Sequence, residues 1–151
     1  METSLRLRAP QAVGGHREVM EQVRHTWISS TLATEIVSLA AAEATITVMA
    51  ERRVPEHLGH VGGAFFSALG GLADRYPALV AGVAGIPEMA FLRFTSEEAG
   101  VMVARAAAVQ GLLFKRTAYN FVSLAHDARA IDRAIEMLEE ACRVASRPPR
   151  G

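Results

Sequence analysis

Hydroxyl side chains that precede a long apolar stretch are the best local candidates for chemistry in this sequence. Ser30 and Thr31 stand directly before residues 32–51, where the pattern predicts a long helix. Hydroxyls and unpaired backbone N–H groups at the start of a helix can bind a phosphate, because the N–H groups and the helix dipole both favour an anion there. The alternative is that Ser30 or Thr31 simply caps the helix.

The histidines and the single cysteine give weaker signals. His57 and His60 are spaced so that both side chains could share one face of a helix, but no HExxH motif and no adjacent Cys or Asp cluster accompanies them. We therefore expect surface histidines and no metal site. His126 is more typical of a loop or packing residue than of a catalytic base. Cys142 lies on an apolar stripe, which favours a core residue over a nucleophile.

Composition limits the class of protein. The chain has 151 residues, 50% of them apolar, with 16 basic and 16 acidic side chains. This length suits one domain or a piece of a larger one. A net charge of zero gives no electrostatic footprint for nucleic acid or an anionic membrane. A lone cysteine excludes an internal disulfide and suits a reducing compartment, so we expect a cytoplasmic protein.

Lysine is almost absent from the chain. Of the basic residues only Lys115 is a lysine, and the others are arginines, as a genome rich in G and C would produce. Any mechanism that needs a lysine must use Lys115 or borrow one from another chain. No targeting signal is evident, and two glutamates interrupt the most apolar stretch, 32–50, so we expect no membrane span.

The elements that must position these residues follow from periodicity and turn signals. Helical spacing predicts a short helix over 17–24, the long alanine-rich helix over 32–51, and a helix from Pro55 to the Tyr76-Pro77 pair. Residues 1–15 form an irregular lead. Residues 146–151 form a frayed tail.

The second half of the chain changes period. Apolar runs at 79–84 and 89–94 predict two strands joined by a turn, and Thr95 with Glu98 fits a capping box for a helix that Gly111 ends. Two more strands are predicted at 112–114 and 120–124, with 115–119 as their connection. Asp127 is expected to cap a last amphipathic helix. The predicted fold class is therefore α+β, a long connecting helix followed by a small sheet covered by helices.

Four stretches of the chain carry a family resemblance. They are AVGGHREVM at 12–20, the hydroxyl turn and alanine helix at 29–42, VPEHL at 54–58, and YNFVSLAHD at 119–127 followed by Ile131-Asp132. In this order they resemble the C-terminal portion of class III pyridoxal-phosphate-dependent aminotransferases, closest to the glutamate-1-semialdehyde aminomutase-like branch. The resemblance covers roughly residues 12–145.

The resemblance implies a part of a fold type I aminotransferase. Residues 16–51 would be the end of the large domain and the connecting helix, and residues 52–145 the small C-terminal α/β domain. Thr31, with Ser30 beside it, matches the position that binds the phosphate of pyridoxal 5'-phosphate, commonly across a dimer interface. The implied partners are a second copy or an N-terminal aminotransferase half, with a small-molecule amino donor and acceptor as substrates.

The chain departs from the family at its reactive centre. The lysine that forms the Schiff base precedes the matched segment in the family, and no lysine stands before Lys115. The aspartate that pairs with the pyridine nitrogen would also lie upstream. We therefore expect no catalytic residue here and no activity from the chain alone. Lys115, Arg116 and Tyr119 would at most line the substrate side.

Several origins fit a chain of this kind. It would be a truncated gene, a fragment with a misplaced start, or one half of a split enzyme. A different class of function is a non-catalytic interaction module that keeps the small domain. The remaining alternative is an unrelated α+β domain.

Overall fold

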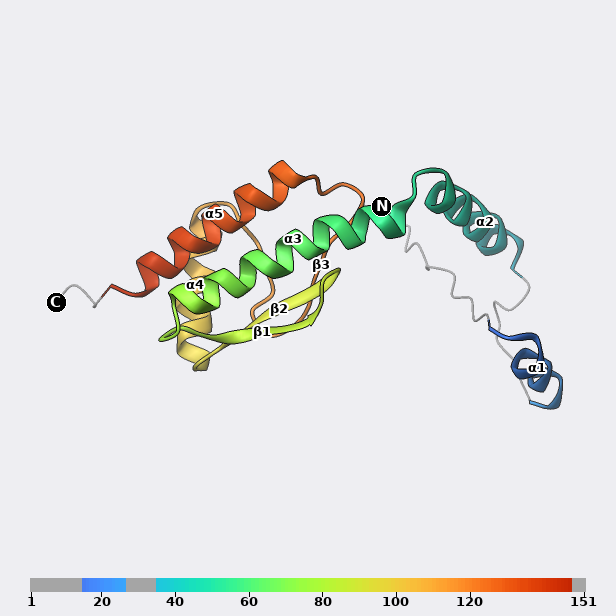
Figure 1. The fold of residues 1–151 in the computed structure, drawn as a ribbon, viewed down its shortest axis with the longest axis horizontal. Coiled ribbons are helices and arrows are strands. Elements are labelled where there is room, and N and C mark those ends of the chain that lie inside the picture. Colours follow the sequence, from blue (N-terminus) through green and yellow to red (C-terminus); the bar gives the residue numbers. More distant parts are fainter. Residues whose placement is uncertain (1–14, 27–34, 148–151) are drawn as a thin grey trace, which may run out of the picture. The chain divides into compact units, whose positions relative to one another are not determined.

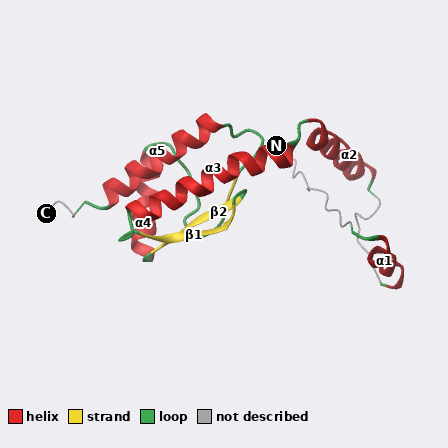
Figure 2. Cartoon of the chain, in the orientation of Figure 1, coloured by secondary structure: helices red, strands yellow, loops and turns green. Residues whose placement is uncertain are grey.

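The computed structural model describes residues 15–26 and 35–147. The chain divides into two compact units, Met1–Arg52 and Arg53–Gly151. Figure 1 shows the course of the chain and Figure 2 its helices and strands. None of the described helices is both long and apolar enough to cross a membrane.

The first unit contains α1 (Arg17–Met20), the 3-10 helix η1 (Glu21–His25) and α2 (Ile36–Glu51). The Glu35 carboxylate caps α2 by accepting the backbone N–H groups of Val37 and Ser38 at 2.9 and 2.7 Å. A hydrogen bond with the Ser38 side chain, followed by those from the backbone N–H groups of Ser38 and Val37, lowers the pKa of Glu35. The described helix begins after Glu35, and Ser30 and Thr31, the predicted caps, lie outside the described residues.

Helix α2 has no core of its own. Its apolar side chains are distributed around the whole helix instead of forming one stripe, and none of its residues is buried. Ile36 and Val37 are each about three-quarters exposed, and Leu39 and Ile46 are more than half exposed. A helix that is apolar on all sides is normally found inside a larger structure.

The second unit is an α+β domain, as the sequence predicts. Its elements are α3 (Val54–Arg75), β1 (Val80–Ile86), β2 (Met89–Phe94), α4 (Glu97–Val109), β3 (Asn120–Phe121) and α5 (Ala128–Ala145). The strands form an antiparallel sheet in the order β1-β2-β3. Helices α3 and α4 contact the sheet, and α5 packs against both of these helices (Figure 1).

Close approach of the β1–β2 turn to α3 requires a glycine. A Cβ atom at Gly62 would lie 2.7 Å from the carbonyl oxygen of Pro87, closer than real Cβ contacts. Gly85, just before the turn, has a φ of 102°, which favours glycine, and a side chain there would meet the carbonyl of Met89. Gly62 therefore lets the hairpin pack directly on α3, and Gly85 lets the two strands of the hairpin approach each other.

The predicted cap of α4 is misplaced by one residue. Ser96, not Thr95, is the N-cap, and its Oγ accepts the backbone N–H of Ala99 at 3.0 Å. The Thr95 hydroxyl instead donates to the carbonyl of Ala78 at 2.8 Å. Thr95 therefore ties the end of β2 to the segment before β1, and it is not available to the helix.

The predicted strand at 112–114 is also wrong. Residues Asn120 and Phe121 take the free edge of β2, pairing with Ala90 and Met89. The N–H of Leu112 donates to the Ala107 carbonyl at 3.0 Å, which binds this segment to the end of α4. The strand predicted over 120–124 is only two residues long.

One apolar core joins the three helices and the sheet. Its fully buried members include Leu69, Leu72, Val103 and Cys142. The stripe of α5 is confirmed, with Asp127 as the N-cap accepting from the Ala130 N–H at 2.8 Å.

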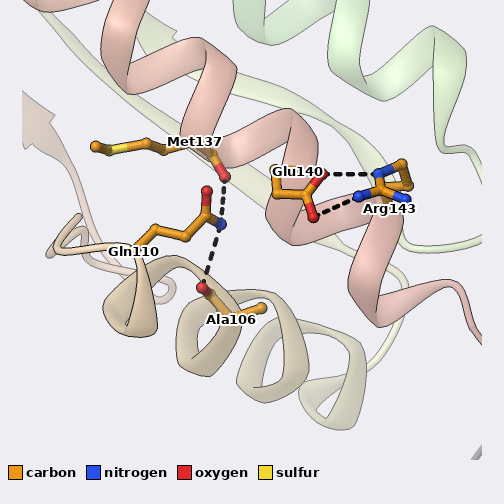
Figure 3. A network of polar contacts seen from close by, with 5 residues as sticks. All are labelled: Ala106, Gln110, Met137, Glu140 and Arg143. Atoms are coloured by element: carbon orange, nitrogen blue, oxygen red, sulfur yellow. Dashed lines mark hydrogen bonds and ion pairs between the residues drawn. The ribbon is translucent and has the colours of Figure 1, made fainter.

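A polar contact joins the end of α4 to the middle of α5. The Gln110 side-chain amide donates to the carbonyl oxygens of Ala106 and Met137, at 3.2 and 3.0 Å, and so links α4 to α5. Figure 3 shows this link beside the Glu140–Arg143 ion pair within α5. Because α5 flanks the site described below, the link helps to fix one of its walls.

Candidate functional site

Ser30 and Thr31, the residues with the strongest phosphate-binding signal, lie outside the described residues. The other sequence candidates lie in the second unit, on α3, in the segment before β3 and at the start of α5.

Lys115 begins a loop that Asn120 holds in place. The Asn120 Oδ1 accepts the Lys115 N–H at 2.8 Å, and its Nδ2 donates to the Lys115 and Ala90 carbonyls at 3.1 and 3.4 Å. Arg116 forms an ion pair with Glu97 at 3.2 Å. The Tyr119 ring packs edge-on against Phe91 with centroids 5.1 Å apart. The loop is thus anchored to β2 at one end and to α4 at the other.

His57 and His126 meet, although the sequence separates them by 69 positions. The Nε2 of His57 lies 2.9 Å from the His126 carbonyl oxygen, where it donates a hydrogen bond. His126 Nδ1 accepts the Ser123 N–H at 3.0 Å and lies 2.9 Å from the Ser123 Oγ. This network fixes the start of α3 against the turn that precedes α5.

The same geometry limits what Ser123 and His126 can do. Because Nδ1 accepts a backbone N–H, the neutral ring is assigned a proton on Nε2. The ring nitrogen beside the Ser123 hydroxyl is therefore already occupied by the turn. A nucleophile needs a base that is free to take its proton. The contact between Ser123 and His126 therefore stabilises the turn. His126 has the structural role that the sequence predicts for it, that of a loop or packing residue.

Metal and thiol chemistry find no support in the described part of the chain. No group of three or more His, Cys, Asp or Glu residues there is arranged to hold a metal ion. His57 donates a hydrogen bond to the His126 carbonyl oxygen, and His60 is exposed. Cys142 is fully buried, and burial raises the pKa of its thiol from 9.0 to about 11, with a smaller contribution from Glu139. A buried neutral thiol is a poor nucleophile.

A cavity of about 490 Å³ lies in the second unit. One wall comes from α3 and β2, through Phe65, Leu69 and Leu92, and the opposite wall from α5, through Ile131 and Leu138. The segment 112–115 and the strand β3 complete it. This size is typical of small-molecule sites, which are mostly apolar with a few polar groups.

Polar groups occur at few positions of the cavity lining. They are Lys115, Tyr119, Asn120 and His126, and the lining contains no aspartate or glutamate. Periodicity could not reveal this cavity, because its walls come from separate elements and the same apolar pattern predicts a filled core. Of the three residues that the resemblance would place on a substrate side, Lys115 and Tyr119 belong to the cavity lining and Arg116 does not.

The described residues do not form a complete pyridoxal phosphate site. None of their polar or charged side chains is buried, and none has a buried polar atom left without a hydrogen bond. Lys115, the only lysine, lies exposed in the loop pinned by Asn120. No step through this cofactor can be derived from the geometry of the second unit.

Comparison with known proteins leaves the family open. Neither the models of known protein families nor the curated protein sequences give a match to this chain.

Proposed function

We propose that this chain is the C-terminal part of a class III pyridoxal-phosphate-dependent aminotransferase or aminomutase, comprising the connecting helix and the small domain. The parent activity is the transfer of an amino group between a small amino donor and a carbonyl compound. The proposal rests on the sequence resemblance. It agrees with the order of elements, a long helix followed by an α+β unit.

The observation that carries the proposal is the contact between two of the resembling stretches. His57 belongs to VPEHL and His126 to YNFVSLAHD, and their hydrogen bond is 2.9 Å long. Ser123 and Asp127 of the second stretch also have local structural roles, in the turn and at the cap of α5. His57, Ser123 and His126 therefore belong to one contact between the two stretches. This shared contact explains why the polar residues of both stretches would occur together.

Helix α2 supports the proposal independently. Its apolar side chains face every direction and remain exposed, so a single neighbouring surface would cover only part of it. A helix that connects two domains and also faces a second subunit would be covered on several sides. The small residues Ala40, Ala41, Ala42 and Ala44 would allow such neighbours to approach closely.

The chain by itself would be inactive under this proposal. Pyridoxal phosphate supplies an electron sink when it is bound to a lysine. Lys115 belongs to the small-domain side, and the family places the reactive lysine before residue 12. A separate large domain, from another chain or another part of the same gene, would have to provide it. Thr31 and Ser30 would contribute phosphate contacts to that combined site.

Reduction with borohydride tests whether the chain alone can bind pyridoxal 5'-phosphate covalently through a lysine. The purified chain, incubated with equimolar pyridoxal 5'-phosphate and reduced, should carry no stoichiometric adduct on Lys115 by mass spectrometry. The Lys115→Arg variant controls for labelling of the N-terminus. A stoichiometric Lys115 adduct together with transaminase turnover would overturn the proposal. The coding sequence upstream of Met1 and the neighbouring reading frames give a second check, because under this proposal one of them should encode the lysine and aspartate that the family requires.

A further inference from the structure

The cavity of the second unit opens to solvent on one side. Leu113 and Phe121 of its lining are mostly exposed, whereas Leu69, Leu92 and Leu138 are buried. A ligand can therefore enter from solvent and contact apolar residues of the core. At about 30 Å³ for each water-sized group, a volume of about 490 Å³ has room for on the order of 15 such groups. Burial of apolar surface away from water is favourable. A small amphipathic molecule would therefore cover the apolar lining with its hydrocarbon part and keep its polar end at the open side.

The polar groups of the lining select the sign of the ligand's charge. Lys115 carries a positive charge, and His126 and Tyr119 can donate from Nε2 and from the hydroxyl. Asn120 is already committed to the Lys115 and Ala90 backbone. No carboxylate lines the cavity to repel an anion.

Neighbouring charges do not reverse this preference. Asp127 follows His126, but its carboxylate accepts the Ala130 N–H and lines an adjoining hollow beside Arg129 and Arg133. This hollow shares Leu112, Ala130 and Ala134 with the cavity, and the two arginines offset the charge of Asp127. Glu97 is paired with Arg116. The start of α5, where the helix dipole favours negative charge, contributes Ala130 to the cavity lining.

We propose that the cavity between α3, β2 and α5 binds an apolar monocarboxylate, with its carboxylate at Lys115 and its hydrocarbon body against Phe65, Leu69 and Leu138. This site belongs to the small-domain unit alone. It requires neither the missing lysine nor the proposed aminotransferase partner.

Titration calorimetry with decanoate, at concentrations below micelle formation, tests the site on the full chain. Decanoate should bind saturably with one molecule per chain, decanol should bind more weakly, and decyltrimethylammonium should bind weakest. Absence of saturable decanoate binding would overturn the proposal. Equal binding of the cationic amphiphile would refute the role assigned to Lys115.

Variants that fill the cavity test whether decanoate binds there or on the exposed helix α2. Ala134 lines the cavity from α5, and Ala134→Leu should weaken decanoate binding at least about tenfold, a loss of about 1.4 kcal/mol. The matched control is Ala104→Leu, a half-buried alanine of α4 outside the cavity lining, which should bind normally. If Ala134→Leu does not fold, Ala130→Leu makes the same test. Unchanged binding by a folded cavity variant would place decanoate elsewhere and overturn the proposal.

Removal of the charge tests the position of the carboxylate. Lys115→Gln should weaken decanoate binding about three- to fivefold, as expected for a partly solvated ion pair, and leave decanol unchanged. Arg105→Gln, an exposed cation of α4 outside the lining, is the control. Equal affinity of Lys115→Gln and the wild-type chain for decanoate would contradict the proposed orientation.

Discussion

Several polar residues that the sequence offers as candidates for chemistry stabilise the fold through hydrogen bonds. Ser123 and His126 close a turn, His57 secures that turn to α3, and Asn120 holds the Lys115 loop. Asp127 was predictable as a cap because its carboxylate precedes a clear amphipathic stripe. The His57–His126 bond was not predictable, since it depends on how two distant segments pack.

Neighbouring glycines of α3 offer a test at the residue scale. Gly62→Ala should destabilise the second unit by about 1–3 kcal/mol, because its Cβ would meet the Pro87 carbonyl. Gly63→Ala has open space around its Cβ and should stabilise the helix by up to about 1 kcal/mol. Urea denaturation followed by circular dichroism measures both. Equal stabilisation by the two substitutions would contradict the observed packing of the hairpin on α3.

At the scale of elements, periodicity gave most of the helices and the β1–β2 hairpin. Residues 54–75 and 128–145 have the spacing of amphipathic helices, and the predicted elements agree with α3 and α5. The errors occur where local patterns allow two outcomes. Thr95 and Ser96 are both good caps, and a tertiary contact with Ala78 decides between them. The run 112–114 could pair only if β2 had a free edge, which β3 occupies.

The cap of α4 can be tested by substitution. Ser96→Ala should lower the free energy of unfolding by about 1 kcal/mol, because the Ala99 N–H loses its acceptor. Glu98→Ala should change it by less than about 0.5 kcal/mol, since Glu98 is exposed and takes no part in the Ser96 cap. Denaturant midpoints of the two variants give the comparison. A larger effect from Glu98→Ala would instead favour the Thr95 capping box.

The whole molecule combines two units of different character. The unit Arg53–Gly151 has a continuous core, whereas no described residue of the unit Met1–Arg52 is buried. The sequence predicted a long helix over 32–51, but periodicity alone could not show that none of the residues of α2 would be buried. A chain with such a helix is expected to be one part of a larger assembly.

Light scattering after gel filtration tests this central claim most directly. The wild-type chain should self-associate through α2 as its concentration rises. The double variant Leu39→Glu with Ile46→Glu should shift it toward the monomer, because it places charge on the exposed helix. Val109→Glu, which alters an even more exposed apolar residue of α4, should associate like the wild-type chain. A wild-type chain that stays monomeric at every concentration would contradict the account of α2 as a helix that other parts of an enzyme normally cover.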